Sequence, residues 1–218
     1  MSKAKHLLFD CDGVLVDTEY IAASKMVVVL NDLEVEISME YFLRNHSGDT
    51  FSSILNRFVN DSLTQSEGTV LINRIEAEVA AEVKIITGVS EMLENVPTSK
   101  SVVSNSSVQA VINALEVTRI KHHFSSQIFS SELVKHPKPS PDIYLLAIKS
   151  LGYSIADILV IEDSLSGAKA ALAAGLIVIG FTGASHILPG HGQNLIDIGV
   201  SRTVDNMQDL AVIINELT

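Results

Sequence analysis

The chain of 218 residues is 47% hydrophobic, which allows one large domain or two modest domains around a sizeable buried core. Its formal net charge of −11 at pH 7 argues against general nucleic-acid binding, because that role needs a basic face. The single cysteine, Cys11, excludes an internal disulfide and favours a cytoplasmic protein, in which we expect Cys11 to be a small buried apolar residue.

The sequence also argues against a membrane protein. The N-terminal residues lead into only a brief apolar run, which is not typical of a secretory signal. Residues 170–196 contain no Asp, Glu, Lys or Arg, but glycines, Pro189 and two histidines interrupt them. We therefore expect a helix, a strand and a loop in this stretch, and no membrane span.

The first informative pattern is a short apolar run at residues 6–9 that ends in two carboxylates, Asp10 and Asp12. Such a run is typical of a buried parallel strand, and alternate side chains of a strand share a face. Gly13 then allows the backbone to turn sharply. Two acids on the same side repel each other unless a cation or a shared proton relieves them. The pattern predicts a metal site, or one acid kept protonated for acid–base chemistry.

Residues 17–82 contain helical patterns without a clear strand. Thr18, Thr50 and Thr64 are plausible helix N-caps, and Thr64 with Glu67 forms a capping-box pattern. We predict a helical insert at 17–82 within an α/β chain formed by residues 1–16 and 83–218.

From residue 83 onwards, expected strands alternate with expected helices. Strands are predicted at 101–103, 127–129, 158–161 and 176–179, and helices at 88–96, 108–115, 142–152, 164–174 and 207–217. Strands separated by helices predict a doubly wound, Rossmann-like parallel sheet.

Polar residues follow two more of these strands: Ser104 with Asn105, and Glu162 with Asp163. Each pair has a simple structural explanation, as a helix N-cap or as a solvated helix start. However, the C-terminal ends of parallel strands meet at one edge of the sheet, where these pairs would join Asp10. Carboxylates there suit Mg²⁺, and Ser104 and Asn105 can donate hydrogen bonds to phosphate oxygens.

Lys138 is the cation expected beside these groups. It lies between Pro137 and Pro139, which fix the local backbone, although a solvated loop lysine is a simpler alternative.

Four segments together resemble the motifs of the haloacid dehalogenase superfamily, whose members are mostly phosphatases and phosphomutases. Residues 10–19, Asp-Cys-Asp-Gly-Val-Leu-Val-Asp-Thr-Glu, resemble the first motif. Ser104 resembles the second, Lys-Pro-Ser-Pro-Asp at 138–142 the third, and Glu162-Asp163 the fourth. The resemblance spans both sides of the insert and nearly the whole chain.

The resemblance implies a role for each matching residue. Asp10 would be the nucleophile that forms an aspartyl-phosphate, and Asp12 would protonate the leaving alcohol and then activate water. Ser104 and Lys138 would bind the phosphoryl group. The insert would be a cap that closes over the site and excludes water.

The resemblance also implies the metal site. Asp163 would ligate Mg²⁺ together with Asp10 and the main-chain carbonyl of Asp12, with Glu162 supporting.

Substrate choice is expected to lie in the cap, where several polar residues surround Gly48. His46 is most simply a surface residue. The candidates are Tyr20, Arg44, Asn45, His46, Gly48 and Thr50.

The leading hypothesis is a magnesium-dependent phosphatase of a small phosphomonoester, such as a sugar or sugar-acid phosphate, acting as a monomer or weak dimer. The alternatives are a β-phosphoglucomutase-like mutase and a phospho-acceptor switch. A mutase must hold a second phosphate in its cap, but residues 47–51 contain no Lys or Arg, and Asp49 would repel a phosphate. Arg44 would restore the mutase hypothesis if it pointed into the site.

Overall fold

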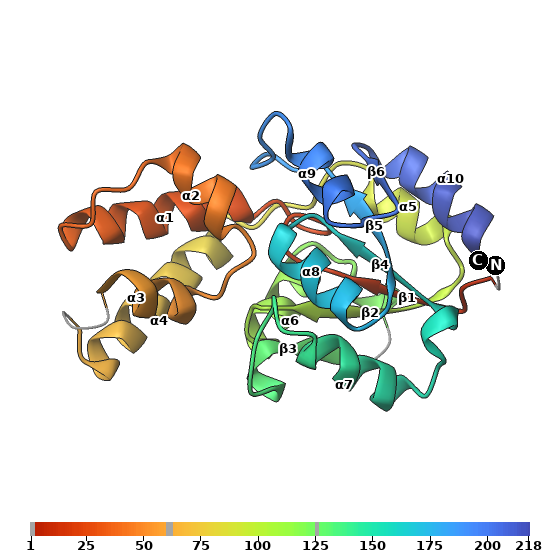
Figure 1. Cartoon of the computed structure of the whole chain (residues 1–218), viewed down its shortest axis with the longest axis horizontal. Coiled ribbons are helices and arrows are strands. Elements are labelled where there is room, and N and C mark those ends of the chain that lie inside the picture. The colour runs from red at the N-terminus through yellow and green to blue at the C-terminus, as the bar shows by residue number, and fades with distance from the viewer. Residues whose placement is uncertain (1–2, 60–62, 125–126) are drawn as a thin grey trace.

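The computed structural model describes residues 3–59, 63–124 and 127–218 (Figure 1). Its centre is a parallel sheet in the order β3-β2-β1-β4-β5-β6. The strands are β1 (His6–Phe9), β2 (Ser99–Ser104), β3 (Ile128–Ser130), β4 (Ile158–Glu162), β5 (Ile177–Phe181) and β6 (Arg202–Val204). The predicted doubly wound, Rossmann-like sheet is confirmed.

Helices cover both faces of the sheet, because alternate residues of the central strands point to opposite sides. Leu7 and Phe9 of β1 belong to one buried apolar cluster, whereas Leu8 belongs to another. The first cluster includes residues of α5 (Val89–Asn95), α6 (Val108–Val117) and α10 (Met207–Leu217). The second includes residues of α7 (Asp142–Leu151), α8 (Leu165–Ala173) and α9 (His191–Asp197).

Two regular elements near the C-terminus were not predicted. The helix α9 has a single fully buried residue, Leu195, so its sequence has little helical periodicity. The edge strand β6 spans three residues, of which only Val204 is buried. Short 3-10 helices also occur at Lys121–His123, Ser131–Leu133 and Ile155–Asp157.

Four helices between β1 and β2 form a group of their own, on the side of the molecule away from α10 in Figure 1. They are α1 (Glu19–Asp32), α2 (Met39–His46), α3 (Phe51–Val59) and α4 (Gln65–Ala81). Their apolar side chains make a third buried cluster that includes Met26, Leu30 and Ile75. The capping box at the start of α4 forms as the sequence predicts: the Thr64 hydroxyl accepts from the Glu67 N–H, and the Glu67 carboxylate accepts from the Thr64 N–H.

The sheet also fixes where a ligand can bind. Successive connections run outward from β1 in one direction and from β4 in the other, so the strand order reverses between these two neighbours. Open α/β sheets bind ligands at the C-terminal ends of strands at such a switch point. Within the described residues, no helix is long and apolar enough to cross a bilayer.

Candidate active site

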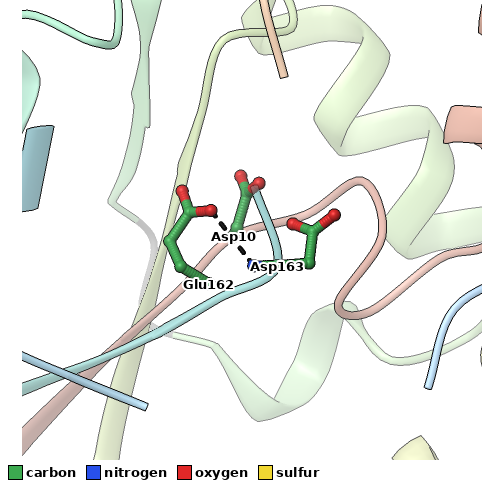
Figure 2. A group of neighbouring side chains, drawn as sticks. All are labelled: Asp10, Glu162 and Asp163. Carbon is green, nitrogen blue, oxygen red and sulfur yellow. Dashed lines mark hydrogen bonds between the residues drawn. The ribbon is translucent and has the colours of Figure 1, made fainter. Parts of the chain in front are cut away.

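Three buried carboxylates meet at the switch point. Asp10 directly follows β1, Glu162 ends β4 and Asp163 comes next, and one oxygen of each lies within 4.8 Å of the others (Figure 2). Burial raises the pKa values of Asp10 and Asp163 well above the usual range, and the neighbouring Glu162 carboxylate raises both further. The edge of the sheet therefore concentrates negative charge where it is costly.

Lys138 is the cation beside this cluster. Its Nζ lies 3.0 Å from Asp10 Oδ1, 2.6 Å from Glu162 Oε1 and 3.0 Å from the Val103 carbonyl oxygen. Burial alone would lower the pKa of this ammonium, but Asp10 and Glu162 raise it well above its ordinary value. Lys138 is 3% exposed, so it is a buried partner of the nucleophile candidate and the solvated-loop alternative is wrong.

Glu162 is held from several sides. Its Oε1 accepts from Lys138 and from the Tyr144 hydroxyl at 3.1 Å, while its Oε2 accepts from the N–H groups of Asp163 and Ser164. The carboxylate also fills the space where a side chain at Gly167 would begin. Glu162 therefore orients Lys138 and has little freedom to move toward a ligand.

The donor set fits a divalent cation. With all three carboxylates ionised, the single ammonium of Lys138 would leave an excess of two negative charges, which a bound cation would offset. Both Asp163 oxygens are buried and, among the described residues, neither has a hydrogen-bond donor. A buried charged oxygen without a partner is costly, and carboxylate oxygens are the ligands that Mg²⁺ prefers. The carboxylate of Asp12 lies outside this cluster.

Hydroxyl groups orient Asp12 on the other side of the nucleophile. Asp12 Oδ1 accepts from Thr18 Oγ1 at 2.5 Å, and Oδ2 accepts from Ser106 Oγ at 2.8 Å and from Ser104 Oγ at 3.3 Å. Thr18 lies at the N-cap position of α1, yet its side chain serves Asp12 and does not cap the helix. The sequence analysis missed Ser106, although it follows Ser104 by two residues in the same polar strand end.

Asn105 links three parts of the site. Its side-chain amide donates to the Gly48 carbonyl at 2.8 Å and to the Lys138 carbonyl at 3.2 Å, and its oxygen accepts from the Lys138 N–H at 3.0 Å. The Asn105 side chain thus joins the loop before α3 to the backbone of Lys138. Its binding of phosphate stays a prediction.

Two histidines that the sequence analysis did not select contact Asp163 from the segment after β5. His186 Nε2 lies 3.0 Å from Asp163 Oδ2, without the angles of a hydrogen bond, and His191 Nε2 donates to the Asp163 carbonyl oxygen at 2.6 Å. Gly13 has φ +80, and a side chain there would overlap both Asp163 and His186. The sequence feature that could have identified them is their position in residues 170–196, a stretch without Asp, Glu, Lys or Arg.

The carboxylate edge opens into a cavity of about 220 Å³ that reaches the four inserted helices. His46, Gly48 and Thr50, three of the six candidates for substrate contact, are among its lining residues, and their contact with a substrate stays a prediction. Tyr20, Arg44 and Asn45 are not among its lining residues.

Those three side chains face elsewhere. Arg44 pairs with Glu40 on the exposed side of α2, at 3.0 Å between Nη2 and Oε1. Asn45 donates to the Tyr41 carbonyl, and Tyr20 is 47% exposed. A helix places neighbouring residues on different faces, so a run of polar residues there cannot all reach one cavity.

The expectation that His46 is a surface residue is wrong. His46 is 4% exposed and contacts the rings of Tyr41, Phe42 and Phe58. Its position at the end of α2 places it on the inner, apolar face of the helix.

Comparison with known proteins identifies the family. The family model described as haloacid dehalogenase-like hydrolase matches residues 7–181. The chain belongs to this family. The resemblance drawn from the four motifs is therefore confirmed.

Named relatives agree with the expected enzyme class. The chain is 25% identical over 198 residues to the 6-phosphogluconate phosphatase of Escherichia coli, covering 87% of each protein. It is 24% identical over 196 residues to hexitol phosphatase A of the same organism, covering 81% of this chain and 82% of the relative. The predicted class, a phosphoric monoester hydrolase, is confirmed, and phosphatases of this family generally use a divalent metal.

A solved structure agrees with the fold along the whole chain. A haloacid dehalogenase-like protein of unknown function from Agrobacterium tumefaciens is 35% identical and superposes with a TM-score of 0.83, covering 98% of both chains.

Proposed function

We propose that the protein is a magnesium-dependent phosphatase that hydrolyses a small phosphorylated carbohydrate through an aspartyl-phosphate on Asp10. The grouping of Asp10 with Lys138 and Asp163 at the switch point, beside a cavity that also contains Asp12, carries this proposal. The names of the 6-phosphogluconate and hexitol phosphatases support a carbohydrate ester.

The reaction has two steps. An Asp10 oxygen attacks phosphorus, the bond from phosphorus to the ester oxygen breaks, and Asp12 gives its proton to the leaving alkoxide. In the second step, Asp12 takes a proton from a water molecule as that water attacks the phosphorus of the aspartyl-phosphate. The bond from phosphorus to the Asp10 oxygen breaks, so phosphate leaves and Asp10 is regenerated. The hydroxyls of Thr18 and Ser106 hold Asp12 for both transfers.

Asp10, Asp163 and the main-chain carbonyl of Asp12 would hold Mg²⁺, with Glu162 supporting from its network with Lys138. When bound, the ion neutralises charge between the anionic nucleophile and the anionic phosphate. Lys138 and Ser104 bind the phosphoryl oxygens in this proposal.

We assign residues 17–82 to a cap domain and residues 1–16 and 83–218 to the core. The separate apolar cluster of the four helices and the hydrogen bond from Asn105 to Gly48 support this division. A seated cap excludes water from the aspartyl-phosphate until the alcohol leaves. The lone buried thiol of Cys11 supports a cytoplasmic enzyme, and we retain the expectation of a monomer or weak dimer.

Phosphate release from a panel of phosphorylated sugars, polyols and sugar acids, with Mg²⁺ or with a chelator, tests the proposal. We expect release that requires both the metal and Asp10, with Asp10→Asn as the control. Release that survives chelation, or equal release by Asp10→Asn, would contradict it.

The same preparation tests the mutase alternative. With β-glucose 1-phosphate, Mg²⁺ and a bisphosphate primer, we expect inorganic phosphate to form faster than glucose 6-phosphate. Faster formation of glucose 6-phosphate would replace the phosphatase proposal with a mutase.

A further inference from the structure

The cavity that leads to Asp10 has an uneven charge distribution. Beyond the catalytic Asp10 and Asp12, its lining includes four acidic side chains, which are Glu19, Asp49, Glu76 and Glu132. Among the described lining residues, Lys138 is the only lysine or arginine. Beyond the catalytic end, the Asp, Glu, Lys and Arg side chains among the described lining residues are therefore all acidic.

Lys138 cannot serve a second anion on the substrate. It is 3% exposed, and its ammonium already contacts Asp10, Glu162 and the Val103 carbonyl at the catalytic end. Any group that it binds beyond these is the phosphate under attack.

None of the three arginines of the cap is among the lining residues, and Arg74 on α4 lies 3.9 Å from Glu78 Oε1. Arg44 pairs with Glu40 on the outer surface of α2. Arg57, whose side chain is 57% exposed, lies 3.9 Å from Asp49 Oδ2, and His46 Nδ1 lies 3.4 Å from the same oxygen. Arg57 is therefore near a carboxylate of the cavity wall, although it is not itself a lining residue.

Glu76 is a lining acid without a compensating partner among the described residues. It projects from α4, is half-buried, and has no hydrogen bond or ion pair to another described residue. Glu76, Glu132 and Asp12 all line the same cavity. Burial raises the pKa of Glu76, and the charges of Glu132 and Asp12 raise it further. A second anion on the substrate would enter the field of all three.

Hydroxyl groups, by contrast, find partners in this cavity. Carboxylates accept hydrogen bonds from hydroxyls, and Thr50, Ser52 and Asn113 add neutral polar groups to the lining. Burial is the largest cause that raises the pKa of Glu19, to about 8.

We propose that this cavity selects a phosphomonoester whose leaving group is uncharged and hydroxyl-rich, and rejects one that carries a second anionic group, with Glu76 as a specificity-determining residue. The inference rests on the proposed phosphatase function and narrows it from sugar and sugar-acid phosphates to neutral sugar or polyol phosphates. It differs from what the name of the 6-phosphogluconate phosphatase would suggest for this chain.

Matched esters isolate the charge. Glucitol 6-phosphate and gluconate 6-phosphate share six carbons and a phosphate, and differ in a terminal hydroxymethyl group against a carboxylate. Glycerol 3-phosphate and 3-phosphoglycerate form the same comparison in a shorter chain. For the wild-type protein with Mg²⁺, we expect kcat/KM to be about tenfold or more higher for the neutral ester than for the anionic ester in at least one pair. In neither pair should kcat/KM be higher for the anionic ester, because like charges in a partly desolvated site repel strongly.

Variants then locate the effect. Glu76→Gln keeps the shape of the side chain and removes its charge. We therefore expect the ratio of kcat/KM for the neutral ester to kcat/KM for the anionic ester to fall several-fold, chiefly because KM for the anionic ester decreases. Glu91→Gln on the exposed side of α5 changes net charge equally, and it should leave the ratio unchanged. Where an ester is not turned over, its inhibition constant against p-nitrophenyl phosphate hydrolysis replaces kcat/KM.

The outcomes separate the two proposals. If phosphate release survives chelation, or if Asp10→Asn releases phosphate equally, the phosphatase proposal fails. If release requires both, but wild-type protein treats the anionic ester of each pair as well as the neutral one, the selectivity proposal alone is overturned. A wild-type preference for neutral esters that Glu76→Gln leaves intact would remove the role of Glu76.

Discussion

The two walls of the cavity are built differently. At the sheet edge, Lys138 and Glu162 are almost fully buried, and each is fixed by several short contacts. At the cap, the side chains of Arg44 and Arg57 are 45% and 57% exposed and lie beside Glu40 and Asp49, and Glu76 has no ion pair with another described residue. The rigid charge network at the sheet edge suits chemistry that needs fixed geometry. The cap wall has fewer hydrogen bonds, so it selects the leaving group of the substrate by shape and charge.

The largest expected effect is a loss of turnover on substitution of the nucleophile at the sheet edge. Asp10→Asn keeps the size of the side chain and removes its nucleophilic oxygen, so we expect a fold that is retained and turnover that falls more than about 10⁴-fold. Single-turnover assays measure the loss, and circular dichroism monitors the fold. Near-normal turnover would exclude covalent catalysis at Asp10.

The next largest effect is expected at Asp12. Asp12→Asn cannot exchange protons but keeps the main-chain carbonyl, so the rate should fall by about 10²–10⁴-fold. Metal affinity, measured by calorimetry, should change little. A large loss of metal affinity would instead make the Asp12 carboxylate a metal ligand.

Lys138→Met tests whether the network stabilises the fold as well as the reaction. Removing one partner of a buried charge pair leaves Asp10 and Glu162 uncompensated, which costs about 3–5 kcal/mol of unfolding free energy. Urea unfolding in the presence of a chelator measures it, and exposed Lys149→Met on α7 is the control.

Adding Glu162→Gln to Lys138→Met should recover part of this loss, because one of the unpaired charges is then gone. No recovery in the double variant would mean that the Lys138–Glu162 contact at 2.6 Å does not carry the coupling.

Gly48 tests the contact between the two walls. It has φ +79, and an added Cβ would lie 2.5 Å from Ser164 Oγ, so Gly48→Ala should prevent the loop from seating on the core. We expect kcat/KM to fall about tenfold, a loss of ~1.4 kcal/mol in transition-state binding. Gly68→Ala, where an added Cβ meets no atom within 4 Å, is the control within the same cap. Equal activity of both variants would contradict a seated cap.

The sheet edge could be predicted from the sequence, and most of the cap wall could not. Parallel strands force their C-terminal ends together, so acids after β1 and β4 had to meet whatever the detailed packing. Asn105 and Glu162 were selected for this reason, although their hydrogen bonds to Gly48 and Lys138 came only from the three-dimensional structure. In the cap, the direction of Arg44 and the burial of His46 depend on how four helices pack, which local spacing does not determine.

The last expected effect is on stability alone, at His6, which lies on β1 and is remote from the cap. Burial lowers its pKa from 6.5 to about 4, so the folded state keeps this ring neutral while the unfolded state takes up a proton below about pH 6.5. Its contribution to stability is complete above pH 6.5 and declines by up to ~1.4 kcal/mol per pH unit on acidification toward pH 4.

His6→Gln should therefore lose less unfolding free energy than wild type between pH 7 and pH 5, as urea titrations can measure. Exposed His122→Gln is the control, and it should follow wild type. Parallel pH profiles for His6→Gln and wild type would show that His6 does not contribute.

Trapping the phosphoryl group on the protein tests the central claim most directly. Wild-type protein and Asp12→Asn are mixed with a phosphomonoester and Mg²⁺, quenched in acid within milliseconds, and digested for mass spectrometry of the peptide that contains Asp10. The account predicts an acyl-phosphate on Asp10 that forms only with the metal and is absent from Asp10→Asn. More of it should accumulate in Asp12→Asn than in wild type, because its hydrolysis is slower there. Continued metal-dependent phosphate release with no phosphoryl group on Asp10, or with the group on another residue, would contradict it.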